Sequence, residues 1–157
     1  MTIKSWLDFL FYDVGKQQYN FRVNGLKKKE DGSVYSTKWK SYMEIISPID
    51  FNEDHKIKFI NNREMLPCEV VIDLEQEKGI NEIIKKIEDD ELYFYVFKTG
   101  SRGFHIHIFF SMNLSNNEKM SIIKRYGGDE MKAYNGTTIA LEYSPHWKTG
   151  RTKELWK

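Results

Sequence analysis

The sequence has little of several things, and each shortage excludes a class of protein. Its 157 residues contain one cysteine, Cys68, so an internal disulfide and a multi-cysteine zinc site are excluded. No apolar run is long enough to span a bilayer, and the first residues do not read as a signal peptide. The formal net charge is only +1, so any nucleic-acid contact must come from local basic patches. We therefore expect an intracellular, cytoplasmic protein that makes no membrane contact.

The composition of the chain is typical of a globular domain. Hydrophobic residues make up 40% of the chain and aromatic residues 15%, which is enough for a packed core. The length suits a single domain over residues 1–157. In the N-terminal extension, residues 1–66, the alternation of Tyr19, Phe21 and Val23 predicts a half-buried strand. The three lysines at residues 27–29 are typical of a solvated turn.

The core, residues 67–157, carries clearer periodic signals. Apolar residues at helical spacing follow Gly79, and a capping box at Ser115 opens a second helix. Between and around the helices lie runs that alternate or are continuously apolar, as strands do. The predicted order is β-α-β-β-α-β, with strands over residues 69–75, 92–97, 104–110 and 137–143.

This order predicts an α+β fold of the ferredoxin-like type, in which the core is RRM-like. In that fold the first and third strands are central neighbours, the fourth flanks the first, and both helices cover one face. Val70, Ile72 and Leu74 would face the helices. Asp73 and Glu75 would share the open face with His105 and His107.

The acids Asp73 and Glu75 are two residues apart on one predicted strand, so their carboxylates project side by side. Solvated acids at a strand end would give the same pattern. The apolar run before them, however, places them on a central strand, where an unneutralised carboxylate pair is costly. Hard oxygen ligands of this kind suit the divalent ions of two-metal phosphoryl transfer.

A glycine-rich loop, residues 99–103, joins two predicted strands. Its glycines allow a ligand to approach the backbone, and Arg102 offers a fork of donors for phosphate oxygens. His105 then emerges on the face that carries the acids. A hairpin with an ordinary surface arginine explains the loop equally well.

Together these motifs resemble the catalytic core of archaeo-eukaryotic primases, the prim-pol superfamily. The acidic pair is Asp73-Leu74-Glu75, the D-x-E form that is similar to prim-pols of archaeal plasmids. The second motif is Gly100-Ser101-Arg102-Gly103-Phe104-His105, and the third acid matches Asp129. A stretch like that of primase small subunits follows, from His146 to Gly150. The resemblance covers roughly residues 68–153, with four motifs in the family's order.

The resemblance implies a DNA primase or polymerase, a nucleotidyltransferase that makes or extends primers on a template. Its cofactors would be two Mg²⁺ or Mn²⁺ ions, and its partners nucleoside triphosphates with a single-stranded DNA template and primer. Catalysis and metal binding would fall to Asp73, Glu75 and Asp129, with Glu142 as the alternate third ligand. The nucleotide-binding residues would be Ser101, Arg102, His105, His146 and Lys148.

Two further expectations concern the template. Arg151 and Lys153 belong to a small basic cluster near the end of the sequence, which suits a nucleic-acid backbone. The zinc-binding insertion of primase small subunits has no room between His105 and Asp129, so no zinc is expected. Template handling would then fall to a partner such as a large primase subunit or a helicase.

Two other functions fit part of the pattern. His105-Ile106-His107 also matches the metal-binding pair of rolling-circle replication endonucleases of the HUH type, with Tyr126 as the candidate nucleophile. That function gives no role to the glycine-rich loop or to the stretch after His146. A non-catalytic RRM-like module that binds nucleic acid without metals is the third possibility.

Overall fold

The computed structural model describes residues 1–157 except 17–19, 46–59 and 135. In the described residues the strands form two four-stranded antiparallel sheets and a separate two-stranded hairpin. The architecture is therefore α+β, as predicted. The first sheet has the order β10-β7-β8-β6. Its strands are β6 (Glu69–Leu74), β7 (Tyr93–Lys98), β8 (Phe104–Phe109) and β10 (Glu154–Leu155).

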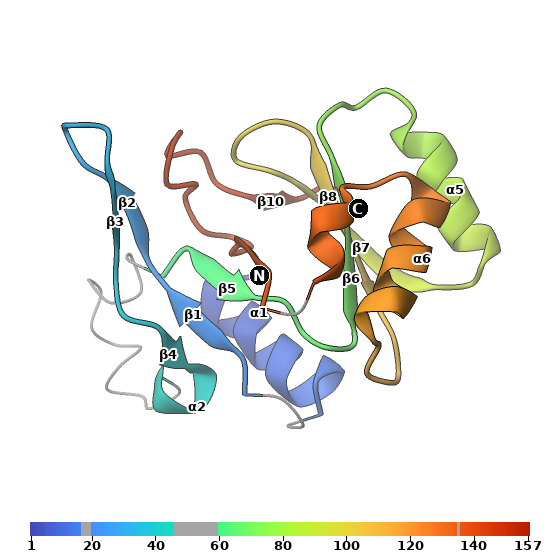
Figure 1. The fold of residues 1–157 in the computed structure, drawn as a ribbon, viewed down its shortest axis with the longest axis horizontal. Coiled ribbons are helices and arrows are strands. Elements are labelled where there is room, and N and C mark those ends of the chain that lie inside the picture. The colour runs from blue at the N-terminus through green and yellow to red at the C-terminus, as the bar shows by residue number, and fades with distance from the viewer. Residues whose placement is uncertain (17–19, 46–59, 135) are drawn as a thin grey trace.

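Two helices cover one face of this first sheet, on the right in Figure 1. Helix α5 (Ile80–Asp89) packs its isoleucine stripe on the sheet, and α6 (Asn116–Tyr126) begins at the predicted Ser115 capping box. The side chains of Val70, Ile72 and Leu74 belong to this core, so the predicted parity of β6 is confirmed. The opposite parity directs Asp73 away from the helices.

The second sheet corrects the predicted topology. Its order is β4-β1-β5-β9, built from β4 (Lys40–Ser41), β1 (Arg22–Asn24), β5 (Asn62–Glu64) and β9 (Thr138–Ala140). The last predicted strand was expected to flank the strand that is β6. Instead β9 pairs with β5, from the N-terminal part of the chain, and Ile139 packs against Val71 of β6. The predicted neighbours β6 and β8 are paired, but the fourth RRM-like position is not filled from β9.

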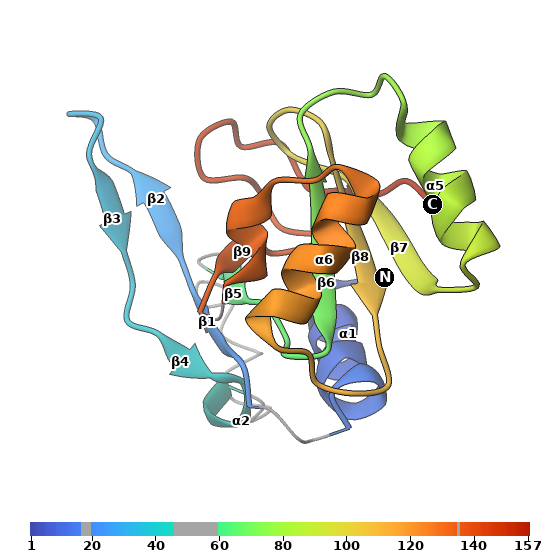
Figure 2. The same cartoon turned by 45° about the vertical axis from the view of Figure 1, so that its right-hand side comes forward.

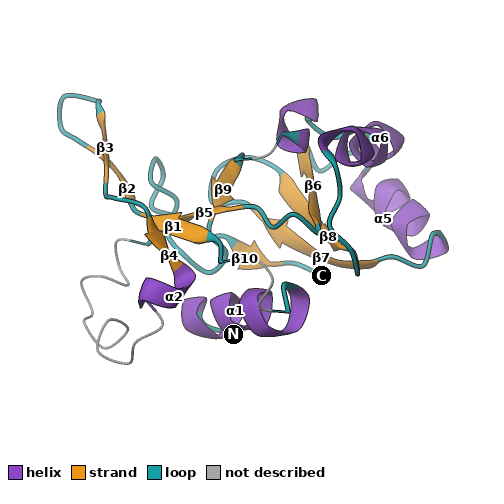
Figure 3. Cartoon of the chain, turned by 60° about the horizontal axis from the view of Figure 1, so that its bottom comes forward, coloured by secondary structure: helices purple, strands orange, loops and turns teal. Residues whose placement is uncertain are grey.

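The N-terminal helices lie on the face of the first sheet that was expected to be open. Helix α1 (Ile3–Asp8) continues into the π-helix η1 (Phe9–Val14), and Figure 3 shows them on the far side of the sheet from α5 and α6. Trp6 is fully buried there, with its ring edge-on to Phe97 at 5.1 Å. The expectation of an open face was therefore wrong, because aromatic side chains of the N-terminal helices cover much of it.

The remaining elements are short. They are the hairpin of β2 (Leu26–Lys28) and β3 (Val34–Ser36), helix α2 (Tyr42–Ile45) and the 3-10 helix η2 (Glu130–Ala133). Phe21 and Val23 of the predicted N-terminal strand are buried, whereas Tyr19 lies outside the described residues. Among the described residues, no helix is both long and apolar enough to cross a membrane.

Candidate active site

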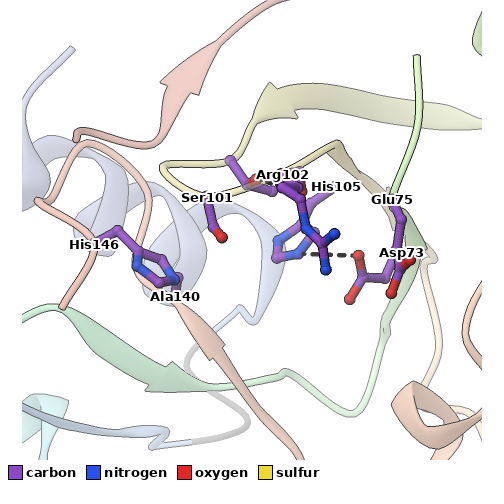
Figure 4. A pocket seen from close by; sticks show the side chains of 8 residues that line it. Asp73, Glu75, Ser101, Arg102, His105, Ala140 and His146 are labelled. Atoms are coloured by element: carbon purple, nitrogen blue, oxygen red, sulfur yellow. Dashed lines mark hydrogen bonds and ion pairs between the residues drawn. The ribbon is translucent and has the colours of Figure 1, made fainter. Parts of the chain in front are cut away.

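One pocket gathers the sequence motifs. It opens at the end of the first sheet, between β6, the loop from β7 to β8, the end of β9 and the loop after Ser144, as Figure 4 shows. Every motif except the third acid contributes to its wall. The lining residues are Asp73, Glu75, Thr99, Ser101, Arg102, His105, Ala140 and His146.

The pair of Asp73 and His105 forms the floor of this pocket. The two residues are directly opposite each other in the β6–β8 register, and Asp73 Oδ1 lies 3.5 Å from His105 Nε2. Burial and the charge of Lys153 lower the pKa of His105 to about 3, so the ring is neutral at neutral pH. Its Nδ1 is buried without a hydrogen-bond partner among the described residues.

The Asp73 carboxyl is ionised at neutral pH. Burial acts to raise its pKa, but the contact with His105 and the positive charge of Lys132 outweigh burial, so the pKa is lowered. Its side chain keeps a quarter of its surface exposed, and Glu75 beyond it is exposed. The two carboxylates are thus accessible from the pocket, as binding of a cation requires.

Two glycines set the shape of the loop. A Cβ on Gly103, which has a φ of +76°, would lie 1.7 Å from the carbonyl oxygen of Leu74. A Cβ on Gly100 would lie 2.1 Å from the carbonyl oxygen of Arg151. Only glycine therefore allows this loop to touch both β6 and the last loop of the chain. Thr99 closes the loop by donating its hydroxyl to the carbonyl of Arg102 at 2.7 Å.

The stretch from His146 to Arg151 packs directly against the glycine-rich loop. The Thr149 hydroxyl donates to the carbonyl of Gly100, and Arg151 donates to the carbonyl of Ser101 at 3.4 Å. His146 faces the pocket, whereas Lys148 is exposed with its Nζ 4.9 Å from the centre of the Trp147 ring. The structure thus brings together the second and fourth sequence motifs, which are far apart in the chain.

Asp129 lies on a second, adjoining hollow that shares Asp73 and Glu75 with the main pocket. Gly128 brings it there, because a Cβ at Gly128 would lie 2.9 Å from Ile72 Cγ2. The Asp129 carboxylate caps η2, accepting from the Met131 amide at 3.0 Å. Within the described residues, no three His, Cys, Asp or Glu side chains converge closely enough to hold a metal ion. Asp129 therefore shares the hollow with Asp73 and Glu75, but the three carboxylates do not converge on one point.

Glu142, the alternate third acid, is turned away from the pocket. Its parity matched Ala140, but β9 ends at Ala140, and a turn follows in which Tyr143 has a φ of +64°. Glu142 is fully buried, with Arg63 Nε 2.9 Å from its Oε2. Burial opposes its ionisation, but Arg63 and then Lys153 hold its pKa well below the usual value. The expectation that Glu142 binds a metal was wrong for this reason.

Glu142 belongs to a buried charge cluster of five residues that joins the two sheets. Arg63 of β5 bridges Glu142 and Glu69 of β6, and Glu69 accepts from His107 Nδ1 at 2.7 Å. Lys153 contacts His107 Nε2 at 3.1 Å and Glu142 at 3.0 Å. Lys153 is 1% exposed, so the expected contact between its ammonium and a nucleic-acid backbone is wrong. Arg151, in contrast, is exposed beside the pocket.

The same cluster bears on the endonuclease alternative. His107 has both ring nitrogens engaged and is fully buried, so neither is free to bind a metal. Tyr126 packs in the core between the helices and the sheet, on the face opposite the histidines, and its hydroxyl donates to Asp90. The two histidines and the candidate nucleophile are therefore separated by the sheet.

Some site residues were missed by the sequence argument. Thr99 and Ala140 line the pocket, and Lys132 of η2 lowers the pKa of Asp73. Thr99 directly precedes the glycine-rich motif and had a visible signal. Ala140 and Lys132 had none, because their approach to Asp73 depends on how β9 and η2 pack.

Comparison with solved structures finds proteins that share this fold. No protein-family model and no curated protein matches the chain. Among solved structures, the polymerase domain of Mycobacterium tuberculosis Ligase D in complex with DNA matches with a TM-score of 0.64 at 10% identity, over 99% of this chain and 79% of that one. The AEP domain of the cyanophage S-2L primase-polymerase matches with a TM-score of 0.62 at 12% identity, over 99% and 88%. At these identities the likeness shows a shared fold.

Proposed function

We propose that this chain is a DNA primase or polymerase of the archaeo-eukaryotic primase superfamily, a template-directed nucleotidyltransferase. The observation that carries the proposal is the convergence of Asp73, Glu75, the glycine-rich loop and His146 on one pocket. The fold shared with two polymerase domains supports the same reaction class. The kinship to archaeal plasmid enzymes is part of the proposal and rests on the D-x-E motif.

Asp73 and Glu75 would hold the divalent ions, Mg²⁺ or Mn²⁺. The donors fit, because magnesium takes one or two carboxylates, keeps several waters and completes its shell with substrate phosphates. When bound, such ions activate the primer 3′-hydroxyl and neutralise the triphosphate. Asp129 shares the adjoining hollow and remains the proposed third ligand, with its carboxylate already engaged at η2.

The phosphates of the incoming nucleotide would lie along the two packed loops. Arg102 supplies a planar fork of donors at the pocket wall, and Ser101 supplies a hydroxyl. His105 has a buried nitrogen without a partner among the described residues, and His146 lies across the pocket. Lys148 and Arg151 add positive charge at the rim. These residues would bind and orient the triphosphate against the carboxylates.

The proposal is tested by incorporation of labelled ribo- and deoxyribonucleotides on single-stranded DNA, with and without a primer, in Mg²⁺ or Mn²⁺. The variant Asp73→Ala/Glu75→Ala should lose incorporation while its circular dichroism spectrum stays native. The matched control Glu82→Ala/Asp89→Ala removes two exposed acids on α5 and should stay active. Incorporation by the Asp73/Glu75 variant at the wild-type rate would overturn the proposal. A covalent DNA–tyrosine adduct would instead favour the endonuclease function.

A further inference from the structure

The hairpin of β2 and β3 stands apart from both sheets. Figures 1 and 2 show it projecting from the body, beside the chain that leads into β4. Among the described strands, β2 and β3 pair with each other, with Lys27 opposite Tyr35 and Lys28 opposite Val34. At the base of the hairpin, Leu26 exchanges two hydrogen bonds with the Asn61 side chain. Every residue from 27 to 36 is exposed. We name residues 22–40, the hairpin and its base, the basic arm.

The basic arm concentrates positive charge that the rest of the chain lacks. It carries six basic residues and two acids, a net charge of +4, against +1 for the whole chain. The remaining residues therefore carry −3. One of the two acids is Asp31. Its carboxylate accepts hydrogen bonds from the amide of Ser33 at 2.9 Å and from the Ser33 hydroxyl at 2.6 Å. The six basic residues are Arg22, Lys27, Lys28, Lys29, Lys38 and Lys40.

Exposed aromatic rings lie among these charges. Tyr35 is 50% exposed and Trp39 is 37% exposed. Each has a cation over its face, Lys29 at 5.8 Å from the Tyr35 ring and Arg22 at 5.6 Å from the Trp39 ring. At the tip the three lysines at 27–29 and Tyr35 line a shallow hollow together with Glu30 and Asp31.

Rings beside cations on a projecting element have the two chemistries that a single-stranded nucleic acid requires. Lysines neutralise phosphates and release counterions, and exposed aromatic faces stack on unpaired bases. A solvated turn explains the lysines but leaves Tyr35 and Trp39 without a role. An isolated two-stranded hairpin is also marginally stable in water, so a bound strand would stabilise it.

We infer that the basic arm binds single-stranded nucleic acid, with Lys27, Lys28 and Lys29 on its phosphates and Tyr35 and Trp39 stacked on its bases. A basic surface of this kind could bind other polyanions, and the choice of a nucleic acid rests on the proposed function. The arm would hold the template away from the pocket, on the chain itself and without a partner subunit.

The experiment measures binding of a fluorescein-labelled oligothymidylate by anisotropy, in EDTA and without nucleotide, over a range of salt concentrations. The variant Lys27→Ala/Lys28→Ala/Lys29→Ala should bind at least about tenfold more weakly at low salt. Its plot of log affinity against log salt should be shallower by about 2, at roughly 0.7 for each lost phosphate contact on a single strand. The matched control Lys85→Ala/Lys86→Ala/Lys124→Ala removes the same charge from α5 and α6 and should bind nearly as the wild type does.

A second variant, Tyr35→Ala/Trp39→Ala, separates stacking from charge. It should bind roughly fivefold or more weakly with an unchanged salt slope. Equal weakening by the arm and control lysine variants would overturn the inference, as would a wild type that does not bind the oligonucleotide. Selective binding of an acidic protein instead of DNA would overturn it too.

The readout distinguishes this inference from the proposed function. If the arm variants lose DNA binding and even the wild type incorporates no nucleotide, the arm is confirmed and the nucleotidyltransferase proposal fails. If the wild type extends primers and the arm variants extend equally well at every template concentration, the arm inference fails and the proposed function stands.

Discussion

Asp73 and His105 face each other across the β6–β8 pair, with Asp73 Oδ1 3.5 Å from His105 Nε2. The register places an ionised carboxylate beside a neutral imidazole in the lining of the pocket. His105 thereby fixes the orientation of one candidate metal ligand while keeping Nδ1 without a partner among the described residues. This one contact links the two strongest sequence motifs.

The first prediction concerns that histidine. His105→Ala removes both the contact with Asp73 and the buried Nδ1, which has no hydrogen-bond partner among the described residues. A hydrogen bond to a charged group contributes about 1.5–3 kcal/mol, so nucleotide affinity should fall roughly tenfold or more. Titration of a fluorescent nucleotide in Mn²⁺ measures this loss. Arg125→Ala, on the far side of α6, is the control, and equal affinities for the two variants would contradict a role for His105 in nucleotide binding.

The second prediction concerns the buried charge cluster. Arg63 neutralises both Glu69 and Glu142, and all three side chains are 0% exposed. Arg63→Ala would leave two carboxylates buried without their main counter-charge, so the free energy of unfolding should fall by about 3–5 kcal/mol. Lys85→Ala breaks an exposed pair on α5 and should change it by about 0–1 kcal/mol. Urea denaturation measures both, and a small loss for Arg63→Ala would show that the cluster does not stabilise the fold.

Three strands of the first sheet could be predicted from the sequence, whereas β10 and the pairing of the second sheet could not. Alternation in β6 and β8 and the isoleucine stripe of α5 are local signals, so the faces of Asp73 and His105 followed from parity. Strand β9 pairs with β5, which lies about 75 residues earlier in the chain. Both strands have three residues, which is too short for a hydrophobic pattern from which the pairing could be predicted.

The same limit explains the two errors at the site. Strand parity made Glu142 the alternate metal ligand, and a basic cluster made Lys153 a candidate nucleic-acid contact. Both are buried because the chain turns at Tyr143, where Arg63 pairs with Glu142 and Glu142 pairs with Lys153. Glu69 shares the parity of Asp73, so its face of the sheet was visible, but its burial and the arrival of Arg63 from another sheet were not.

The third prediction is a dependence of stability on pH. Burial and the charge of Lys153 lower the pKa of His107, so the folded state resists protonation of a ring that titrates near 6.5 in the unfolded chain. The groups facing it are Glu69, Glu142 and Lys153. Below pH 6.5 the unfolded state therefore binds more protons, and stability falls as the pH falls.

Each proton that the unfolded state binds in excess of the folded state lowers the free energy of unfolding by at most about 1.4 kcal/mol per pH unit. Melting temperatures measured in EDTA from pH 7.5 to about 5 should drop steadily for the wild type. His107→Gln should drop less steeply over that range, whereas the variant of the half-buried residue 146, His146→Gln, should keep most of the slope. Parallel curves of melting temperature against pH for His107→Gln and the wild type would contradict the role of His107 in this pH dependence.

The fourth prediction tests the contact between the glycine-rich loop and β6. Gly103 and Gly32 both have positive φ angles, +76° and +86°, so alanine strains the backbone at either position by about 1–2 kcal/mol. Only at Gly103 would the new Cβ also clash, since it would lie 1.7 Å from the Leu74 carbonyl oxygen, whereas at Gly32 nothing lies within 4 Å. Gly103→Ala must therefore push the loop away from Asp73 and Glu75, and it should lose nucleotide incorporation as well as stability. Gly32→Ala should lose only the smaller amount of stability in the same thermal melt. If Gly103→Ala incorporated nucleotide at the wild-type rate, the close approach of loop and strand would have no part in the reaction.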